Sequence, residues 1–373
     1  MTSSKEEKAA ETAEVVGFPC RSCGNQMRFA PEIGRLYCTY CKKSEPLPEE
    51  TVLAAEYEYF PETDKFTAPE GQEKRLKSLS CPYCGADTLI PVQAVTADCP
   101  FCGSHFVTVP ETDESIITPE TMTPFTVSEN AARDAFLRWA KKRVFSPFGF
   151  HKETKTAPMS GIYLPAFTFD TDTDTVYDGF GGRRRTVTYQ TRVNGKTVTR
   201  TRTVTDWYPI SGREERYLDD ILIPASKKVD RRTFDRLTPF STKTLHPYRH
   251  AYLAGFFCER YDMGPTDLFP EVRERAQSDM EAHIRAVRGY DTYRGMSYRH
   301  HFSHVKFKHI LLPVWFASYT YRKKKYYFLV NGETAKVAGD APLSPLKVAL
   351  AAIGGVLAVG LLAWGILAAM GGF

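Results

Sequence analysis

The sequence lacks the short motifs that mark three common classes of hydrolase. None of the patterns GxxxxGK[ST], HExxH and GxSxG occurs in its 373 residues. The first pattern binds nucleotide phosphates, the second holds a catalytic zinc ion, and the third presents a nucleophilic serine. The sequence therefore contains no motif that indicates an ATPase, a metalloprotease or an α/β-hydrolase. We expect the protein not to be an enzyme.

The N-terminus lacks an apolar segment of the kind that directs secretion. Residues 1–16, MTSSKEEKAAETAEVV, are rich in charge and predict a disordered tail instead of a signal peptide. We therefore expect a reducing compartment, where cysteines are seldom paired as disulfides. The nine cysteines of the chain then become candidate metal ligands.

Charge is absent from the last 26 residues, 348–373, which read VALAAIGGVLAVGLLAWGILAAMGGF. A helix of about 20 apolar residues crosses the hydrocarbon core of a bilayer and satisfies its own backbone hydrogen bonds. We predict a transmembrane helix over 348–370. A buried core helix is the alternative, but such helices are seldom uncharged on every face. Ala351 and Gly355 have the small-xxx-small spacing that favours helix association in lipid.

Basic residues flank the apolar segment only on its N-terminal side. Lys347 adjoins it, and Lys336 and the basic run 322–325 lie further upstream. Because cytoplasmic flanks of membrane helices are enriched in lysine and arginine, we predict a tail-anchored protein of the cell (inner) membrane. It crosses the membrane once and keeps its N-terminus in the cytoplasm.

Eight cysteines form two copies of the pattern CxxC-x14-CxxC, offset by 61 residues. The first set is Cys20, Cys23, Cys38 and Cys41, and the second is Cys81, Cys84, Cys99 and Cys102. Four thiolates in tetrahedral geometry make a closed structural zinc site, which has no open position for a catalytic water. The sequence therefore predicts two zinc ribbons, at 17–45 and 78–109, joined by an acidic linker at 46–77. Two structural zinc ions are expected to stabilise them.

Each ribbon is expected to contain a hairpin between its cysteine pairs. In the first ribbon we expect strands at 27–29 and 35–37, and in the second at 88–92 and 94–97. Gly24, Gly85 and Gly103 follow a second cysteine, where the chain turns tightly with positive φ. Lys42 takes that position after Cys41, so this turn departs from the pattern.

Residues 110–342 predict one β-rich α+β domain. Helices are indicated at 130–139, with Ser128 as N-cap, and at 267–288. Asn194 and Gly195 join two β-branched runs, which predicts a type I′ hairpin. The segments 162–169 and 311–319 each contain Leu-Pro and suggest a duplicated sheet module, and proline within a strand favours a first residue or an edge.

Three further groups of residues could carry chemistry, but each also fits a structural role. The candidates are His300, His301, His304 and His309; Asp170, Asp172 and Asp174; and Cys258. The histidines lack a neighbouring carboxylate motif. The aspartates alternate as on an exposed strand face and lack the glycine of a calcium loop. Cys258 is expected to be a buried apolar thiol.

Nucleic-acid binding is the alternative function that the sequence leaves open. The first ribbon combines basic and aromatic residues: Arg21, Arg28, Arg35, Lys42, Lys43, Phe29, Tyr37 and Tyr40. The predicted hairpin is basic too, through Arg183, Arg184, Arg185, Arg192, Lys196, Arg200 and Arg202. Basic and aromatic faces of this kind bind single strands. The same composition also fits strand faces that are simply solvated, or a face that lies near lipid headgroups.

The whole chain from Cys20 onward resembles a bacterial family, the YdjG-type membrane proteins with N-terminal zinc ribbons of the TFIIB type, often labelled primosomal or helicase-like. The resemblance lies in GIYLPAF at 161–167, WYPISG at 207–212, DDILIPAS at 219–226, YLAGF at 252–256 with Glu259 and Tyr261, LPVW at 312–315 and VNG at 330–332. Ala335 stands where the family tends to have glycine.

The resemblance implies a scaffold or adaptor, not a helicase. Members are thought to pair with another membrane protein and to recruit SPFH and phage-shock-type proteins to a stressed membrane. We therefore expect a tail-anchored scaffold that docks partners through its zinc ribbons. A membrane-tethered nucleic-acid binder is the alternative.

Overall fold

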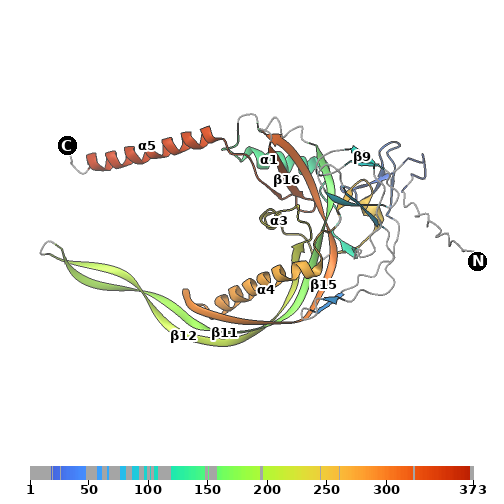
Figure 1. Ribbon diagram of the computed structural model, residues 1–373. Coiled ribbons are helices and arrows are strands. Elements are labelled where there is room, and N and C mark those ends of the chain that lie inside the picture. Colours follow the sequence, from blue (N-terminus) through green and yellow to red (C-terminus); the bar gives the residue numbers. More distant parts are fainter. Residues whose placement is uncertain are drawn as a thin grey trace, which may run out of the picture.

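The computed structural model describes residues 18, 20–25, 27–47, 57–60, 65–66, 76–80, 86–91, 96–98, 101, 105–107, 119–147, 150, 158–193, 196–243, 245–259, 261–321 and 324–369. Three long strands organise them (Figure 1): β11 (Met159–Val193), β12 (Lys196–Pro224) and β15 (Thr292–Tyr321). β11 lies between the other two and is antiparallel to both. The fold is α+β with a large mixed sheet, as the sequence predicts.

Shorter strands extend this sheet to twelve strands in the described part of the chain. They are β4 (Tyr57–Phe60), β5 (Lys65–Phe66), β6 (Leu76–Ser80), β7 (Asp87–Pro91), β10 (Thr121–Met122), β13 (His246–Pro247), β14 (Phe257–Glu259), β16 (Lys324–Asn331) and β17 (Val337–Gly339). β10 and β14 run parallel to β15 and β11, respectively. Long-range pairing therefore gathers segments from most of the chain into one sheet.

Two helices confirm the sequence prediction closely. α1 (Glu129–Lys141) begins after Ser128, whose Oγ accepts a hydrogen bond from the amide of Ala131 at 3.3 Å. α4 (Pro265–Arg288) packs on the sheet and buries its apolar stripe, which includes Val272 and Met280. The shorter elements α3 (Arg231–Leu237) and η1 (His250–Leu253) lie in the connections between strands.

The first Leu-Pro segment lies inside a central strand, so the expectation of an edge or a strand start is wrong for Pro165. On one edge of β11, pairing with β14 ends at Tyr163 and pairing with β12 starts at Ala166. The carbonyl of Pro165 faces that same edge and accepts from the amide of Ala225 at 3.0 Å. Pro165, which has no backbone N–H, therefore lies between the segments of β11 that pair with β14 and with β12. No inter-strand hydrogen bond is lost at this position.

The second Leu-Pro segment repeats this arrangement at Pro313. On the edge of β15 away from β11, pairing with β10 ends at Leu311 and pairing with β16 starts at Val314. The carbonyl of Pro313 accepts from the amide of Gly332 at 2.8 Å on that edge. The two Leu-Pro segments are also antiparallel neighbours, and each proline marks the place where a central strand changes partners.

The predicted hairpin is confirmed and is longer than the sequence indicated. β11 and β12 pair continuously from Thr171↔Leu218 to Val193↔Lys196. The turn at Asn194 and Gly195 lies outside the described residues. The distal part of the hairpin projects from the body of the molecule (Figure 1).

The apolar C-terminal segment forms the helix α5 (Pro345–Ala369). It is long and apolar enough to cross a membrane, and none of the span Pro345–Gly365 is buried against the rest of the chain. A core helix would bury its apolar side chains, so this observation argues against the buried alternative. The amide of Ser344 donates to the carbonyl of Phe145 at 2.8 Å, and α5 extends away from the body beyond this point (Figure 1).

Candidate metal centre

Four cysteines near the N-terminus bring their sulfur atoms together. The Sγ atoms of Cys20, Cys23, Cys38 and Cys41 all lie within 4.8 Å of one another. Cys20 and Cys41 are 3.4 Å apart, and Cys23 and Cys38 are 3.6 Å apart. A tetrahedral zinc ion with Zn–S bonds of about 2.3 Å separates its ligands by about 3.8 Å. The first predicted ligand set therefore has the donors and the spacing that a structural zinc ion needs.

The fold of this segment explains why the sulfurs converge. β1 (Met27–Ala30), β2 (Arg35–Cys38) and β3 (Ser44–Glu45) form a three-stranded antiparallel sheet. β1 and β2 are the predicted hairpin, and the cysteine pairs stand at its open end. The segment is a compact ribbon whose two turns face each other.

The two turns have the same geometry although one carries lysine. After Cys23 the chain turns through Gly24 at φ 72°, and after Cys41 it turns through Lys42 at φ 63°. The amide of Gly24 donates to the carbonyl of Cys20 at 2.8 Å, and that of Lys42 to the carbonyl of Cys38 at 2.9 Å. Lys42 thus adopts the left-handed conformation that glycine prefers.

Backbone amides in these turns favour thiolates. The amides of Ser22 and Cys23 lower the pKa of the Cys20 thiol. The amide of Cys41 is the main cause that lowers the pKa of Cys38 to about 7. The amide of Lys43 acts in the same direction on Cys41, but burial and the neighbouring sulfurs outweigh it and raise that pKa to about 12. Four sulfurs this close need a cation to be ionised together.

The ribbon packs on the body of the protein. Met27, Phe29 and Leu36 are buried in one apolar cluster with residues of α1, β15 and η1. The Phe29 ring meets that of Tyr252 edge-on at 5.0 Å, and its amide donates to the carbonyl of Ala254 at 2.8 Å. The first cysteine site is therefore tied to the folded body over a distance of more than 200 residues in sequence.

The second predicted ligand set, Cys81, Cys84, Cys99 and Cys102, lies outside the described residues. Its predicted hairpin is wrong where the strands are described. β7 pairs with β6 and with β14, and β8 (Thr96–Asp98) pairs with β9 (His105–Val107). β7 joins the main sheet by pairing with β14, in the register Cys258↔Leu89. β14, which is distant in sequence, therefore pairs with β7 where the sequence predicted the strand 94–97.

Phe101, between Cys99 and Cys102 in sequence, contacts the main sheet. Its ring meets the ring of Phe316 edge-on at 5.4 Å, and the Lys228 ammonium lies 5.1 Å from its centroid. Sequence reasoning missed this contact, because Phe101 stands inside a CPFC motif and gave no signal beyond that motif.

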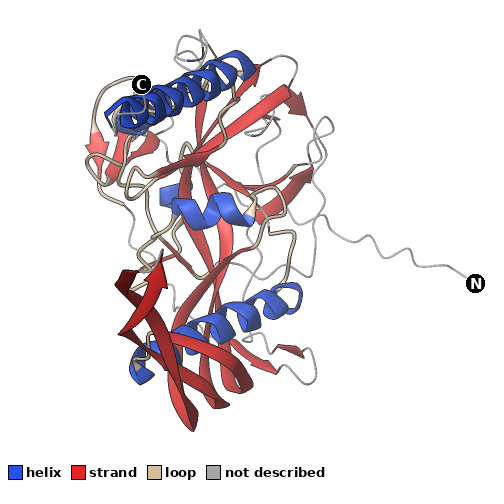
Figure 2. Cartoon of the chain, turned by 90° about the vertical axis from the view of Figure 1, so that its left-hand side faces the viewer, coloured by secondary structure: helices blue, strands red, loops and turns tan. Residues whose placement is uncertain are grey.

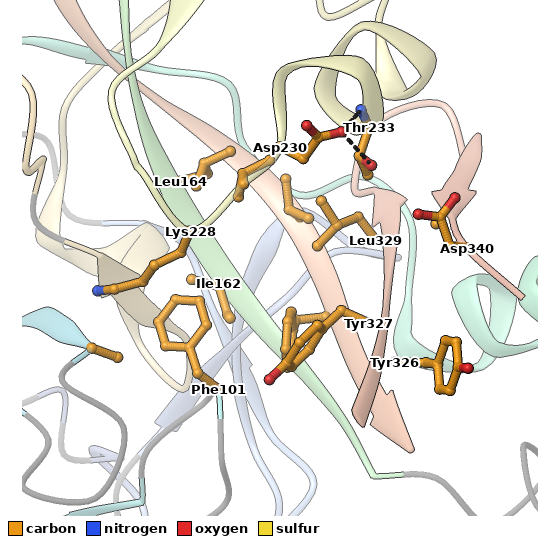
Figure 3. A pocket seen from close by; sticks show the side chains of 15 residues that line it. Phe101, Ile162, Leu164, Lys228, Asp230, Thr233, Tyr326, Tyr327, Leu329 and Asp340 are labelled. Carbon is orange, nitrogen blue, oxygen red and sulfur yellow. Dashed lines mark hydrogen bonds between the residues drawn. The ribbon is translucent and has the colours of Figure 1, made fainter. Parts of the chain in front are cut away.

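Phe101 also lines a mainly apolar pocket of about 460 Å³ (Figure 3). Ile162, Leu164 and Leu329 are among the sheet residues that line it. Asp230, on its rim, accepts hydrogen bonds from the amide and hydroxyl of Thr233 at 3.1 and 3.3 Å and so caps α3. A cavity of this size and lining suits an apolar group.

The four candidate histidines lie along β15 in different surroundings. His300 is bonded to the Thr175 hydroxyl at 2.9 Å, and burial lowers its pKa. His304 is exposed and lies 3.0 Å from a carboxylate oxygen of Asp172. His309 is buried against the rings of Phe167 and Tyr261. Among the described residues, no group of three metal-ligating side chains includes them.

Asp170 departs from the predicted exposed strand face. A bulge between Asp170 and Asp172 turns Asp170 inward, where it is 2 % exposed. Its carboxylate accepts from the amide of Asp220 at 2.8 Å and lies 3.8 Å from Lys308 Nζ. Burial is the main cause that raises its pKa. One carboxylate oxygen of each of Asp170, Asp219 and Asp220 lies within 4.8 Å of the other two. Cys258 is buried, as predicted.

The chain is similar to the uncharacterized protein YdjG of Bacillus subtilis (strain 168). The two are 29% identical over 355 residues, which covers 90% of this chain and 92% of that protein. This similarity supports a YdjG-type protein. It covers most of the chain, in agreement with the extent of the resemblance found from motifs. No protein-family model and no solved structure matches the chain.

Proposed function

We propose that this YdjG-type protein is a tail-anchored membrane scaffold that holds partner proteins through structural zinc ribbons. The observation that carries the proposal is the apolar helix α5, whose span Pro345–Gly365 is not buried against the rest of the chain. An unpacked apolar helix of this length requires lipid or a partner helix to cover it. The body then lies in the cytoplasm, on the side of Lys347.

Zinc in this proposal is structural, with two ions per chain. Cys20, Cys23, Cys38 and Cys41 would hold the first ion, supported by the distances between their sulfurs. Cys81, Cys84, Cys99 and Cys102 would hold the second, supported by the repeated pattern in the sequence. Each ion supplies the folding energy that a ribbon this small lacks.

Metal analysis of purified protein tests this part. We expect about two zinc ions per chain, and Cys38→Ser should lose one of them. Cys258→Ala is the matched control, since it removes a buried thiol far from the ribbon in sequence and should keep the full zinc content. Equal zinc content in Cys38→Ser and the control would contradict the site.

The first ribbon offers a surface for partner proteins. Its inner face packs on the body, while the outer face leaves Tyr40 and Ile33 exposed to 74% and 49%. Arg28 and Arg35 are exposed on the same small sheet. Exposed tyrosine and arginine are residue types in which protein interfaces are enriched.

The partners that we propose come from the family resemblance. They are another membrane protein and proteins of the SPFH and phage-shock type, joined in an assembly that responds to membrane stress. The small residues of α5, such as Gly355, would let a second transmembrane helix approach closely, either from a partner or from a second copy. Gly355→Leu should weaken such an association.

Co-purification from membranes in mild detergent tests the scaffold. Wild-type protein should retain SPFH or other membrane partners. Tyr40→Ala, or the pair Cys81→Ser and Cys84→Ser, should lose partners but stay in the membrane. Tyr217→Ala, which also removes an exposed tyrosine, is the control. Partners that survive all these changes would show that the ribbons do not hold them.

Nucleic-acid binding is the second candidate, and the exposed basic residues of the ribbon and hairpin favour it. Arg28, Arg35, Arg200 and Arg202 are all exposed. A single-stranded RNA or DNA probe should then bind with an affinity that falls steeply as salt rises. Nucleic acid as the only companion of the purified protein would replace the scaffold with this function.

A further inference from the structure

The distal hairpin is a two-stranded arm. β15 leaves β11 after the pair Gly182↔Thr292, whereas β11 and β12 stay paired from Arg183↔Asp206 to Val193↔Lys196. We call residues 183–193 and 196–206 the arm. Eleven residues per strand extend it by about 37 Å. A two-stranded hairpin buries little apolar surface and contributes little to stability, so stability does not account for its length.

The strand register divides the arm into two unlike faces, since residues directly opposite each other point to the same side. The basic face carries Arg183, Arg185, Val187, Tyr189, Thr191, Lys196, Val198, Arg200, Arg202, Val204 and Asp206. The threonine face carries Arg184, Thr186, Thr188, Gln190, Arg192, Thr197, Thr199, Thr201, Thr203 and Thr205. Valine and tyrosine thus lie only on the face that holds most of the positive charge.

The basic face is open to solvent. Tyr189 and Val198 are 41% and 39% exposed, and the Arg202 guanidinium lies 5.5 Å from the Tyr189 ring. Asp206 is the one acidic residue of the arm, and Arg185 pairs with it at 2.5 Å. Lys196 and Arg200 form no ion pair with any other residue that the structure describes. The face therefore combines unpaired positive charge with exposed apolar groups.

We propose that the basic face of the arm binds the surface of an anionic phospholipid bilayer. Arginine and lysine would contact lipid phosphates, while Tyr189 and the valines reach the boundary between headgroups and acyl chains. The exposed valine between the charges favours this partner over nucleic acid, since bases can stack on Tyr189 but offer no acyl layer for an aliphatic side chain. The threonine face would stay in water.

The position of α5 supports this partner, and to that extent the inference rests on the proposed membrane anchor. The arm and α5 project from the same side of the body in Figure 1, and this side faces the viewer in Figure 2. The arm cannot run parallel to a spanning helix, because its charges would enter the hydrocarbon. All residues from Val348 to Gly365 are exposed, so the contacts that the structure describes hold α5 only at its base, where Ser344 and Lys347 bond to Phe145 and Val144. A change of angle at this base would let the arm lie along the headgroups.

Photocrosslinking in the full-length protein tests the arm. A benzophenone amino acid replaces Tyr189 on the basic face or, as the matched control, Thr188 on the threonine face. The protein is placed in nanodiscs of phosphatidylcholine, with or without about 30% phosphatidylglycerol, and phospholipid adducts are measured by mass spectrometry. We expect adducts at position 189 that require the anionic lipid, and few at 188.

Charge variants that carry the label at position 189 show whether binding depends on the basic face or only on the net charge of the arm. Arg200→Thr with Arg202→Thr should lower the adduct yield about tenfold, since each basic residue near an anionic surface adds to binding. Arg184→Thr with Arg192→Thr removes the same charge from the threonine face and should change it less than about twofold. Equal losses in the two variants would overturn the assignment of the face.

Membrane anchoring by α5 is measured separately, as co-migration of the protein with the nanodisc. A chain that stays with the disc but gives equal adducts at 188 and 189 overturns the arm proposal alone. A chain that leaves the disc overturns the anchor, and the same label is then tested on added phosphatidylglycerol vesicles. Adducts with RNA or protein in whole cells, without lipid, would replace the bilayer as the partner.

Discussion

At the scale of single residues, backbone conformation explains one departure from the family pattern. Ala335 stands where the resemblance leads us to expect glycine, and it adopts φ 58°. It lies in the turn after Asn331, whose side-chain oxygen accepts from the amides of Glu333 and Thr334 at 2.8 and 2.9 Å. The turn therefore keeps the left-handed conformation although a side chain makes it costly.

Ala335→Gly should stabilise the protein by about 1 kcal/mol, because glycine removes that cost. Ala286→Gly, in an exposed position of α4, is the control and should destabilise by about 1 kcal/mol. Chemical denaturation of the detergent-solubilised protein measures both. A loss of stability in Ala335→Gly would show that the methyl group contributes packing that outweighs the backbone cost.

Asp170→Asn should stabilise the protein more at pH 7 than at pH 4. Burial raises the pKa of Asp170 above its ordinary 3.8 in the folded state, so ionisation is penalised only there. That penalty develops as the pH rises above the ordinary pKa and is complete above the folded-state value. The amide cannot ionise and should escape the penalty while it still accepts from Asp220.

The melting temperature of Asp170→Asn, compared with wild type from pH 4 to pH 7, checks this expectation. Asp178→Asn removes a charge from an exposed position of the same strand and serves as control. If the advantage of Asp170→Asn shrinks as the pH rises, the attraction of Lys308 outweighs the cost of burial.

At the scale of elements, the sequence predicted those whose signals are local. The N-cap at Ser128 and the apolar spacing of α4 act within one or two turns of helix, and both predictions are confirmed. The two β-branched runs beside Asn-Gly pair as predicted, while the turn itself lies outside the described residues. The prediction for Pro165 was wrong because β12 and β14, its neighbours on the edge of β11 away from β15, come from later segments of the chain. The pairing of β7 with β14 was missed for the same reason.

α4 provides a test of packing on the long strands. Met280 is fully buried with Leu218 and Ala276, so Met280→Ala should destabilise the protein by about 2–5 kcal/mol through lost apolar contact and a cavity. Val287 lies on the same helix and is 58% exposed, so Val287→Ala should cost less than about 0.5 kcal/mol. Similar costs for both would mean that the stripe of α4 does not hold the sheet.

At the scale of the whole molecule, the first ribbon and the body share a core that no local pattern indicates. The sequence predicted four clustered cysteines, because metal spacing is short and regular. The sequence did not predict that Phe29 packs on Tyr252, because no local pattern relates two residues so far apart in the chain. Loss of zinc from the first ribbon should therefore loosen the body as well.

The anchor predicts that one charge in the middle of α5 will release the protein from the membrane. Leu357→Arg places a guanidinium near the centre of the span Pro345–Gly365, where arginine costs about 2.5–3.5 kcal/mol. Leu346→Arg, the matched control, adds the same charge beside Lys347, where it can reach the headgroups. Extraction with alkaline carbonate should release the first variant and retain the second.

Neither change should alter the fold of the body, because Leu346 and Leu357 are 61% and 62% exposed. Zinc content and the melting temperature of the released protein measure this independence. If Leu357→Arg also unfolds the body, α5 packs on protein and the anchor proposal fails. If both variants stay in the membrane, the arm or a partner holds the protein there, and a double variant that also carries Arg200→Thr and Arg202→Thr separates these two cases.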